Sequence, residues 1–248
     1  MRRFVVGVQY DGAGFVGFQK QPKGQSVQQV LENAIFEVAR ENVNVIGCGR
    51  TDSGVHAIES IAHFDIENQK LSPSNLVGGC NVNLPAGVKI LWAKEVGENF
   101  HAQKSAKKKT YAYVCYVSKV ELPIFAGKAA QILEMPNIEK MRQAANFLVG
   151  LHDFSSFCAS RSGRENFQRR VFSINIEQRE SVVPMLVFEI CGNGFLYKMV
   201  RNIVGTLLEV GQGRREPGEV EDILKAKDRK RAGRTAAACG LYLKRVEY

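Results

Sequence analysis

The spacing of apolar residues divides the N-terminal part of the chain into strands and helices. Phe4–Tyr10 is rich in β-branched and aromatic residues and stops at Asp11, which is typical of a strand. Over Val27–Arg40 the apolar residues recur at helical spacing, and Ser26 with Gln29 forms a capping box at the start. Further strands are predicted over Val43–Cys48, Ile58–Ile66 and Val88–Val96, and a second helix begins near Ser72-Pro73.

The rest of the chain repeats this order of elements, although residue identity between the two parts is not obvious. The pattern predicts, in order, a strand over Thr110–Val117, a helix over Asn137–Val149, strands over Arg170–Gln178 and Val183–Cys191, a helix over Phe195–Leu208 and a closing strand over Leu241–Val246. The charged stretch Val210–Gly233 adds a helix near Val220–Ala226.

Two β-α-β-β-α-β units are two ferredoxin-like halves. We therefore predict an α+β protein with an N-terminal half over residues 1–104 and a C-terminal half over residues 105–248, divided at the basic run Lys104–Lys109. The second half carries the charged helical insertion. Each half is expected to form an antiparallel sheet with its helices on one face, which leaves the other face free.

Composition narrows the class of protein. The 248 residues are 45% hydrophobic and carry a net charge of +9, which favours a polyanionic partner but is equally common among ordinary enzymes. No apolar run is long enough to span a membrane, and Gly7, Gln9 and Asp11 interrupt the N-terminus too early for a signal peptide. We expect a cytoplasmic protein that does not associate with membranes.

The cysteines are scattered and form no pair at metal-ligand spacing. They are Cys48, Cys80, Cys115, Cys158, Cys191 and Cys239. A disulfide scaffold would be short and dense in cysteine, so we expect free thiols in a reducing compartment and no structural zinc.

The segment Gly12–Gly17 (GAGFVG) fits the dinucleotide-binding pattern G-x-G-x-x-G. That site needs a helix that opens in the loop, whereas the continuation from Phe18 to Lys23 is not helical, so we expect no nucleotide cofactor. The aromatic residues also resemble an RNA-recognition strand, but two glycines fit that poorly. A glycine-rich loop that lets RNA or another backbone approach closely, with Lys20 as an RNA contact, fits better.

The segment Gly49–Ala57 (GRTDSGVHA) lies in the loop between two predicted strands. Asp-Ser-Gly is ordinary turn chemistry, so the plain interpretation is a surface turn. Two features instead favour a reactive carboxylate at Asp52. Arg50 is near enough to hold that carboxylate ionised, and the flanking strands give the loop a rigid mount.

Two later segments combine basic residues with aromatic or apolar ones. Lys107–Lys109 precede Tyr111, which indicates either a solvated strand start or a basic rim beside a ring on which a base stacks. Arg201 lies in a strongly apolar helix, where an arginine usually extends its charged end to the edge. Alternatively, packing holds Arg201 so that it pairs with a carboxylate on another element, and no pattern names that carboxylate.

Taken in order, these motifs closely resemble the tRNA pseudouridine synthase A family from end to end. The matching segments are Tyr10–Gly12, Gly17–Gln19, Gly49–Ala57, Asn83–Pro85, Phe100–Ala102, Tyr111–Tyr113, His152–Phe154, Met199–Asn202 and Gly240–Leu243. The Gly-Arg-Thr-Asp segment is highly specific to that family. The chain departs from the family at Phe18, usually tryptophan, at Gln103, usually arginine, and at Ala236–Ala238, often Ala-Pro-Ala. Of these departures, only Gln103 bears on an expected contact, which is a contact with one phosphate of the RNA.

The resemblance implies a fold and a function. The two halves would form one extended antiparallel sheet with the active cleft between them. The enzyme would isomerise uridine to pseudouridine in the anticodon arm of tRNA, at positions 38–40, usually as a homodimer.

The resemblance also implies roles for individual residues. Asp52 matches the catalytic nucleophile, Tyr111 the ring that stacks on the target base, and Arg201 the basic residue paired with Asp52. Arg50 matches the arginine that helps to extrude the nucleotide. Further substrate contacts are expected at Thr51, His56, Lys20 and Lys107.

The reaction breaks the uracil N1–C1′ bond and rejoins the ring through C5. Because the atoms are conserved, we expect neither a cofactor nor a metal. An ionised Asp52 would attack either C6 of the ring or C1′ of the sugar. A paired uridine must first be extruded from its stem, and a stacking ring such as Tyr111 would keep the detached uracil in place.

Two other functions fit parts of this pattern. A non-catalytic RNA-binding protein that helps tRNA to fold would keep the basic residues but would not need Asp52. A small-molecule enzyme on a ferredoxin-like scaffold would not need the lysine clusters. The combination of Arg50, Asp52, Tyr111 and Arg201 argues against both.

Overall fold

The computed structural model describes residues 1–159 and 165–248, and its contacts divide the chain into two compact units. Unit 1 comprises Met1–Lys107 together with Tyr242–Tyr248, and unit 2 comprises Lys108–Leu241. The contacts thus assign the end of the chain to unit 1. The expected halves, residues 1–104 and 105–248, stay a prediction about how the chain is organised.

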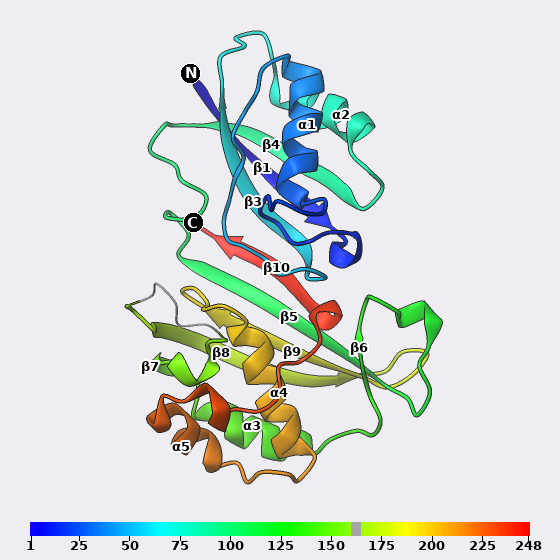
Figure 1. The fold of residues 1–248 in the computed structure, drawn as a ribbon, viewed down its shortest axis with the longest axis vertical. Coiled ribbons are helices and arrows are strands. Elements are labelled where there is room, and N and C mark those ends of the chain that lie inside the picture. The colour runs from blue at the N-terminus through cyan, green and yellow to red at the C-terminus, as the bar shows by residue number, and fades with distance from the viewer. Residues whose placement is uncertain (160–164) are drawn as a thin grey trace. The chain divides into compact units, whose positions relative to one another are not determined.

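Unit 1 has the β-α-β-β-α-β order that the sequence predicts. Its elements are β1 (Arg2–Tyr10), α1 (Val27–Ala39), β2 (Ile46–Gly47), β3 (His56–Ile66), α2 (Pro73–Asn83), β4 (Val88–Val96) and β10 (Leu241–Glu247), whose first residue belongs to unit 2. β1 pairs antiparallel with β3 and β4, and β2 pairs antiparallel with β3. β10 runs parallel to the start of β3. The helices α1 and α2 lie beside one another on one side of these strands (Figure 1).

Local signals explain where the helices of unit 1 begin. The Ser26 hydroxyl accepts a hydrogen bond from the Gln29 N–H and caps α1, as the sequence predicts. Ser72 caps α2 in the same way, and Pro73 occupies the first turn, where no backbone N–H is needed.

The strand β2 is much shorter than the predicted Val43–Cys48. The Val45 N–H donates to Glu32 Oε1, and Gln28 Nε2 donates to the Val45 carbonyl. Because side chains of α1 satisfy these backbone groups, they are not available for a ladder with β3, and only Ile46–Gly47 pairs.

Unit 2 is also a mostly antiparallel sheet with helices, and the predicted α+β class is confirmed. Its elements are β5 (Lys108–Val117), β6 (Ala130–Ile132), α3 (Ile138–Asn146), β7 (Gly150–Asp153), β8 (Gln168–Arg179), β9 (Met185–Gly192), α4 (Met199–Gly211) and α5 (Glu219–Ala226). The strands follow the order β5-β9-β8-β7, and β6 runs parallel to β5. The helices α3 and α4 lie together over the strands (Figure 1).

Several elements of unit 2 differ from the prediction. The short strands β6 and β7 were not expected. α4 begins at Met199 rather than Phe195, because Lys198 has a left-handed backbone with φ of 57° that does not continue a helix. α3 ends at Asn146, before the predicted Val149. Short 3₁₀ helices complete the chain, at Gly12–Gly14, Pro123–Phe125, Ser155–Phe157, Arg229–Arg231 and Ala238–Gly240.

Each unit has its own core. In unit 1 the rings of Phe4 and Phe64 stack at 6.1 Å, and Leu31 and Ile35 of α1 are fully buried. In unit 2 Phe154 and Phe157 are fully buried together with the inner face of α4. Within residues 1–159 and 165–248, no helix has the length and apolar character needed to span a membrane.

Candidate active site

Asp52 lies in a tight turn just before β3. The Val55 N–H donates to the Asp52 carbonyl at 3.2 Å, and Gly54 takes a φ of 77° to close the turn. Asp52 is partly exposed, while Thr51 and Val55 on either side are buried. The turn therefore holds the partly exposed Asp52 on an anchored backbone.

The glycines of the GAGFVG segment support this turn. A Cβ on Gly12 would lie 2.1 Å from the Val55 carbonyl oxygen, and a Cβ on Gly17 would lie 2.5 Å from the Thr51 carbonyl oxygen. The Phe18 N–H donates to that same Thr51 oxygen at 3.2 Å. The segment thus serves the close approach of another backbone, one of the two interpretations favoured by the sequence.

A buried hydroxyl pair anchors the same turn. The Tyr10 hydroxyl and Thr51 Oγ1 share a hydrogen bond of 2.8 Å at the end of β1. Burial raises the pKa of Tyr10, so its phenol stays protonated. Thr51 was expected to contact substrate. It is 8% exposed and its hydroxyl is hydrogen-bonded to Tyr10, so in the structure Thr51 fixes the backbone next to Asp52.

His56 ties three segments of unit 1 together. Its Nδ1 accepts a hydrogen bond from the Gly12 N–H at 3.0 Å and lies 3.1 Å from Asp11 Oδ1. Its ring stacks on Tyr242 of β10 with 4.5 Å between centroids. Since the side chain is 2% exposed, it holds the end of the turn in place, and its expected contact with substrate stays a prediction.

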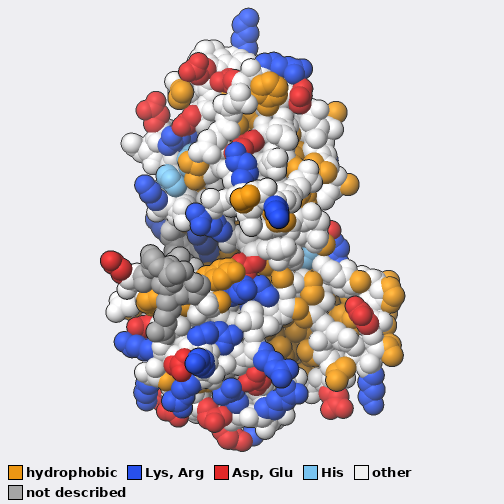
Figure 2. All heavy atoms as spheres, in the orientation of Figure 1, with side chains coloured by type: hydrophobic (Ala, Val, Ile, Leu, Met, Phe, Trp, Pro, Cys, Tyr) orange, Lys and Arg blue, Asp and Glu red, His pale blue; other side chains and the backbone are white. Residues whose placement is uncertain are grey.

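The expected basic contacts of unit 1 lie at the surface. Arg50 and Lys107 are exposed. Lys20 is also exposed, but its Nζ lies 2.6 Å from Glu32 Oε2, which partly balances its charge. In the view of Figure 2, Lys and Arg side chains occur on both units among Asp and Glu side chains.

Tyr111 and Arg201 both belong to unit 2. The Tyr111 ring, on β5, meets Phe195 edge to face at 5.2 Å, which holds its orientation. Arg201 lies in the first turn of α4, and its Nε–H donates to the Ala236 carbonyl at 2.7 Å. The Ala236 N–H donates back to the Arg201 carbonyl at 3.1 Å. The expected pairing of Arg201 with Asp52 stays a prediction.

A polar network next to Arg201 escaped the sequence analysis. Asn202, which is fully buried, accepts hydrogen bonds from Arg229 and Thr235. Arg229 opens an Arg-Lys-Arg run that is typical of a solvated surface, so no local pattern separates it from its neighbours. Its bond to Asn202 joins residues 27 positions apart, which no local pattern reports.

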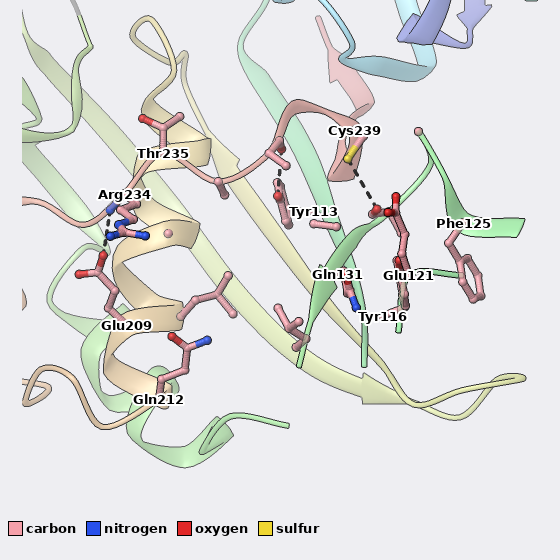
Figure 3. A pocket seen from close by; sticks show the side chains of 18 of the residues that line it. Tyr113, Tyr116, Glu121, Phe125, Gln131, Glu209, Gln212, Arg234, Thr235 and Cys239 are labelled. Carbon is pink, nitrogen blue, oxygen red and sulfur yellow. Dashed lines mark hydrogen bonds between the residues drawn. The ribbon is translucent and has the colours of Figure 1, made fainter. Parts of the chain in front are cut away.

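A cavity of about 350 Å³ lies in unit 2, and the segment from Arg234 to Ala237 forms part of its wall (Figure 3). Tyr113, Tyr116, Phe125 and Cys239 contribute to its wall, but neither Tyr111 nor Arg201 does. All six cysteines are free thiols. In the described part of the chain, no group of three or more His, Cys, Asp or Glu side chains is placed to hold a metal ion.

Comparison with known proteins assigns the chain to a family. The family model described as tRNA pseudouridine synthase matches residues 7–103 and 144–248. The tRNA pseudouridine synthase A of Thermoanaerobacter sp. (strain X514) is 44% identical over 248 residues, which is 100% of both chains. That of Limosilactobacillus reuteri is 43% identical over 100% of this chain and 97% of the relative. That of Janthinobacterium sp. (strain Marseille) is 39% identical over 100% and 92%.

Proposed function

The chain belongs to the tRNA pseudouridine synthase family, enzymes that isomerise uridine to pseudouridine in tRNA, and we propose that it acts on positions 38–40 of the anticodon arm with Asp52 as nucleophile. The observation that carries the proposal is the anchored turn of Asp52. Its backbone is fixed through Gly12, Gly17 and Tyr10, while Asp52 itself stays partly exposed. A reacting group must be held in this way to reach a substrate in one geometry.

In the proposed reaction the ionised carboxylate of Asp52 attacks either C1′ of the ribose or C6 of the uracil. The N1–C1′ bond breaks, the uracil turns over and the C5–C1′ bond forms. The bond between Asp52 and C1′ or C6 breaks again, which releases the carboxylate. C5 then loses its proton and N1 gains one, so the product has the same atoms as the substrate. Every step after the attack depends on keeping the detached uracil within reach of C1′.

The two residues of unit 2 are assigned supporting roles. The Tyr111 ring is fixed by Phe195 and stacks on the uracil, which prevents its escape while it turns. The Arg201 guanidinium pairs with the Asp52 carboxylate and orients it. The Nε–H bond of Arg201 to Ala236 supports this role, because a planar guanidinium held at Nε presents its terminal nitrogens in a defined direction.

The basic residues are proposed to bind the RNA. Arg50 braces the gap that the extruded uridine leaves, and Lys107 and Lys20 contact phosphates. Recognition rests on the shape and phosphates of tRNA, so affinity should fall steeply as salt concentration rises. We further propose that the enzyme is a homodimer and acts in the cytoplasm, where its substrate is found.

The target is tested with tRNA from cells that lack this modification. The tRNA is incubated with the wild-type protein, and pseudouridine is mapped nucleotide by nucleotide. We expect new pseudouridine at positions 38–40 of the anticodon arm. New pseudouridine only at other positions would refute the target and leave the reaction intact. Tight tRNA binding without any pseudouridine would favour a protein that only helps tRNA to fold.

A further inference from the structure

Arg201 is fixed by a stretch of chain without regular secondary structure. Ala236 lies between two 3₁₀ helices, Arg229–Arg231 and Ala238–Gly240. It exchanges two hydrogen bonds with Arg201, one from the Arg201 side chain and one to the Arg201 backbone. Whatever fixes Ala236 therefore also fixes the plane of the Arg201 guanidinium.

The segment from Gly233 to Ala237 is tethered residue by residue. The Gly233 N–H donates to Thr206 Oγ1, and the Arg234 N–H donates to Glu209 Oε1, both at 2.9 Å. The Tyr113 hydroxyl donates to the Ala237 carbonyl, also at 2.9 Å. Figure 3 shows Arg234 and Thr235 on this segment as it runs past α4, with Glu209 directed toward it.

The helix approaches this segment closely at Gly205. A Cβ there would lie 1.7 Å from the Arg234 carbonyl oxygen. The glycine lies one turn after Arg201 on α4, so the segment and the helix are in backbone contact where Arg201 is held.

Arg229 joins the segment to the helix. Its Nη1 donates to the carbonyls of Ala232 and Gly233, at 3.2 and 3.0 Å. Its Nη2 donates to Asn202 Oδ1 and Thr235 Oγ1, both at 3.0 Å. One planar guanidinium thus serves four acceptors, which the single ammonium of a lysine could not reproduce.

Asn202 and Thr235 complete the connection. Thr235 Oγ1 accepts from Arg229 and donates to Asn202 Oδ1 at 2.6 Å. Asn202 Nδ2 donates to the Phe157 carbonyl at 2.7 Å, so both ends of this buried amide are bonded. Asn202 follows Arg201 directly on α4. The chain of bonds therefore runs from the helix through Arg229 and Thr235 to the residue beside Ala236.

We propose that Arg229, Thr235 and Asn202 form a positioning relay that sets the orientation of Arg201 through the Ala236 carbonyl and is needed for the full rate of the chemical step. The proposal rests on the role assigned to Arg201 in the proposed function. These three are positioning residues, because they act on the reaction only through Arg201. The relay should consequently change the rate of conversion of bound tRNA and leave the affinity for tRNA unchanged.

The test compares two substitutions at Thr235 with a matched control. Thr235→Val keeps the shape but removes the hydroxyl, and Thr235→Ser keeps the hydroxyl. Ser156→Ala is the control, because the buried Ser156 hydroxyl donates to the Ile223 carbonyl in the same unit without joining the relay. We would measure the single-turnover rate of pseudouridine formation with excess enzyme. The dissociation constant for tRNA is measured for each variant as well.

We expect Thr235→Val to lower the single-turnover rate about tenfold with the dissociation constant unchanged within about twofold. Thr235→Ser should restore the rate to within about threefold of wild type, and Ser156→Ala should leave it within about twofold. An equal loss with Ser156→Ala, or a Thr235→Val defect confined to tRNA binding, would overturn the relay. If Thr235→Val does not fold, Arg229→Lys takes its place with the same expectations.

A double-mutant cycle separates the relay from the function on which it rests. In an Arg201→Lys background, Thr235→Val should lower the rate by less than about twofold, because its path to the reaction is already broken. A full tenfold further loss would overturn the relay. If Arg201→Lys itself leaves the rate unchanged, the role of Arg201 fails and the relay fails with it. If the wild type forms no pseudouridine, the proposed function itself is refuted.

Discussion

The two units hold their site residues by different means. In unit 1 the turn of Asp52 rests on another stretch of backbone, which approaches closely because Gly12 and Gly17 have no side chains. In unit 2 the segment that holds Arg201 also passes close to a glycine, Gly205, but the carbonyl that bonds Arg201 is fixed in addition by buried side-chain hydrogen bonds, with Arg229 at their centre. Backbone packing tolerates no added atom, whereas a polar network tolerates shape changes but not the loss of a partner.

Among the residues that support the site, the largest expected effect comes from adding one methyl group under the turn of Asp52. Gly12→Ala places a Cβ against the Val55 backbone, which should destabilise the protein by about 3 kcal/mol or more and slow pseudouridine formation about 100-fold. The matched control is Gly14→Ala, because a Cβ at Gly14 has no atom within 4 Å. Thermal unfolding and single-turnover rates are compared. A Gly12→Ala protein with wild-type stability and rate would contradict the backbone-packing account of unit 1.

The next effect tests the polar network of unit 2. Asn202→Ala leaves Arg229, Thr235 and the Phe157 carbonyl each short of a partner, and should cost about 2 to 3 kcal/mol of folding free energy. Asn81→Ala is the comparison. The Asn81 side chain exchanges two hydrogen bonds with the backbone of Ile90, and its loss should cost about 1 kcal/mol. Denaturant unfolding measures both. Equal costs would mean that the network adds nothing beyond its separate bonds.

The contacts that these two predictions test could not be found from the sequence, whereas several helices and strands could. Alternating and helical patterns place β1, α1, β4, β5 and α5 to within about two residues, because each pattern reports the burial of its own element. They fail where distant groups intervene. Glu32 and Gln28 take up the backbone of Val45 and shorten β2. The patterns also miss one local feature, the left-handed backbone of Lys198, which delays the start of α4.

The site residues also fall into those that the sequence could identify and those that it could not. Asp52, Tyr111 and Arg201 could be named because contiguous motifs resemble a family. The residues that hold them could not, since Gly12 meets Val55 and Arg229 meets Asn202 only after folding. The glycines of Gly12–Gly17 have the spacing of a dinucleotide-binding motif. Only the backbone contacts of the folded chain show that the segment supports the turn of Asp52. The expected pairing of Asp52 with Arg201 likewise depends on contacts that no local pattern contains.

A smaller effect is expected from the Tyr10 hydrogen bond that anchors the turn of Asp52 to β1. Tyr10→Phe removes the phenol that bonds to Thr51 and should cost about 1 kcal/mol, with a rate loss below about fivefold. The glycine contacts still hold the turn in this variant. A rate loss as large as that of Gly12→Ala would shift the main support of the turn from backbone packing to the hydroxyl pair.

The smallest effect concerns pH. Burial acts to raise the pKa of Glu209, but hydrogen bonds from Arg215 and from the Arg234 N–H outweigh it, so this pKa lies below its ordinary value. A depressed carboxyl pKa stabilises the folded state above the ordinary pKa, and that stabilisation is lost as pH falls through the folded pKa. Glu209→Gln should therefore be less stable than wild type by about 1 kcal/mol at pH 7, and this difference should shrink as pH falls from 7 toward 2. Melting curves at both values check this, and a difference that persists at low pH would refute it.

The central claim is that the Asp52 carboxylate carries out the reaction, and the most direct test is the single-turnover rate of Asp52→Asn on tRNA that lacks the modification. Asp222→Asn, at an exposed position on α5, is the matched control. We expect Asp52→Asn to bind tRNA as wild type does but to form pseudouridine at least about 1,000-fold more slowly, with the control unaffected. An Asp52→Asn protein that retains more than about a tenth of the wild-type rate would contradict the claim.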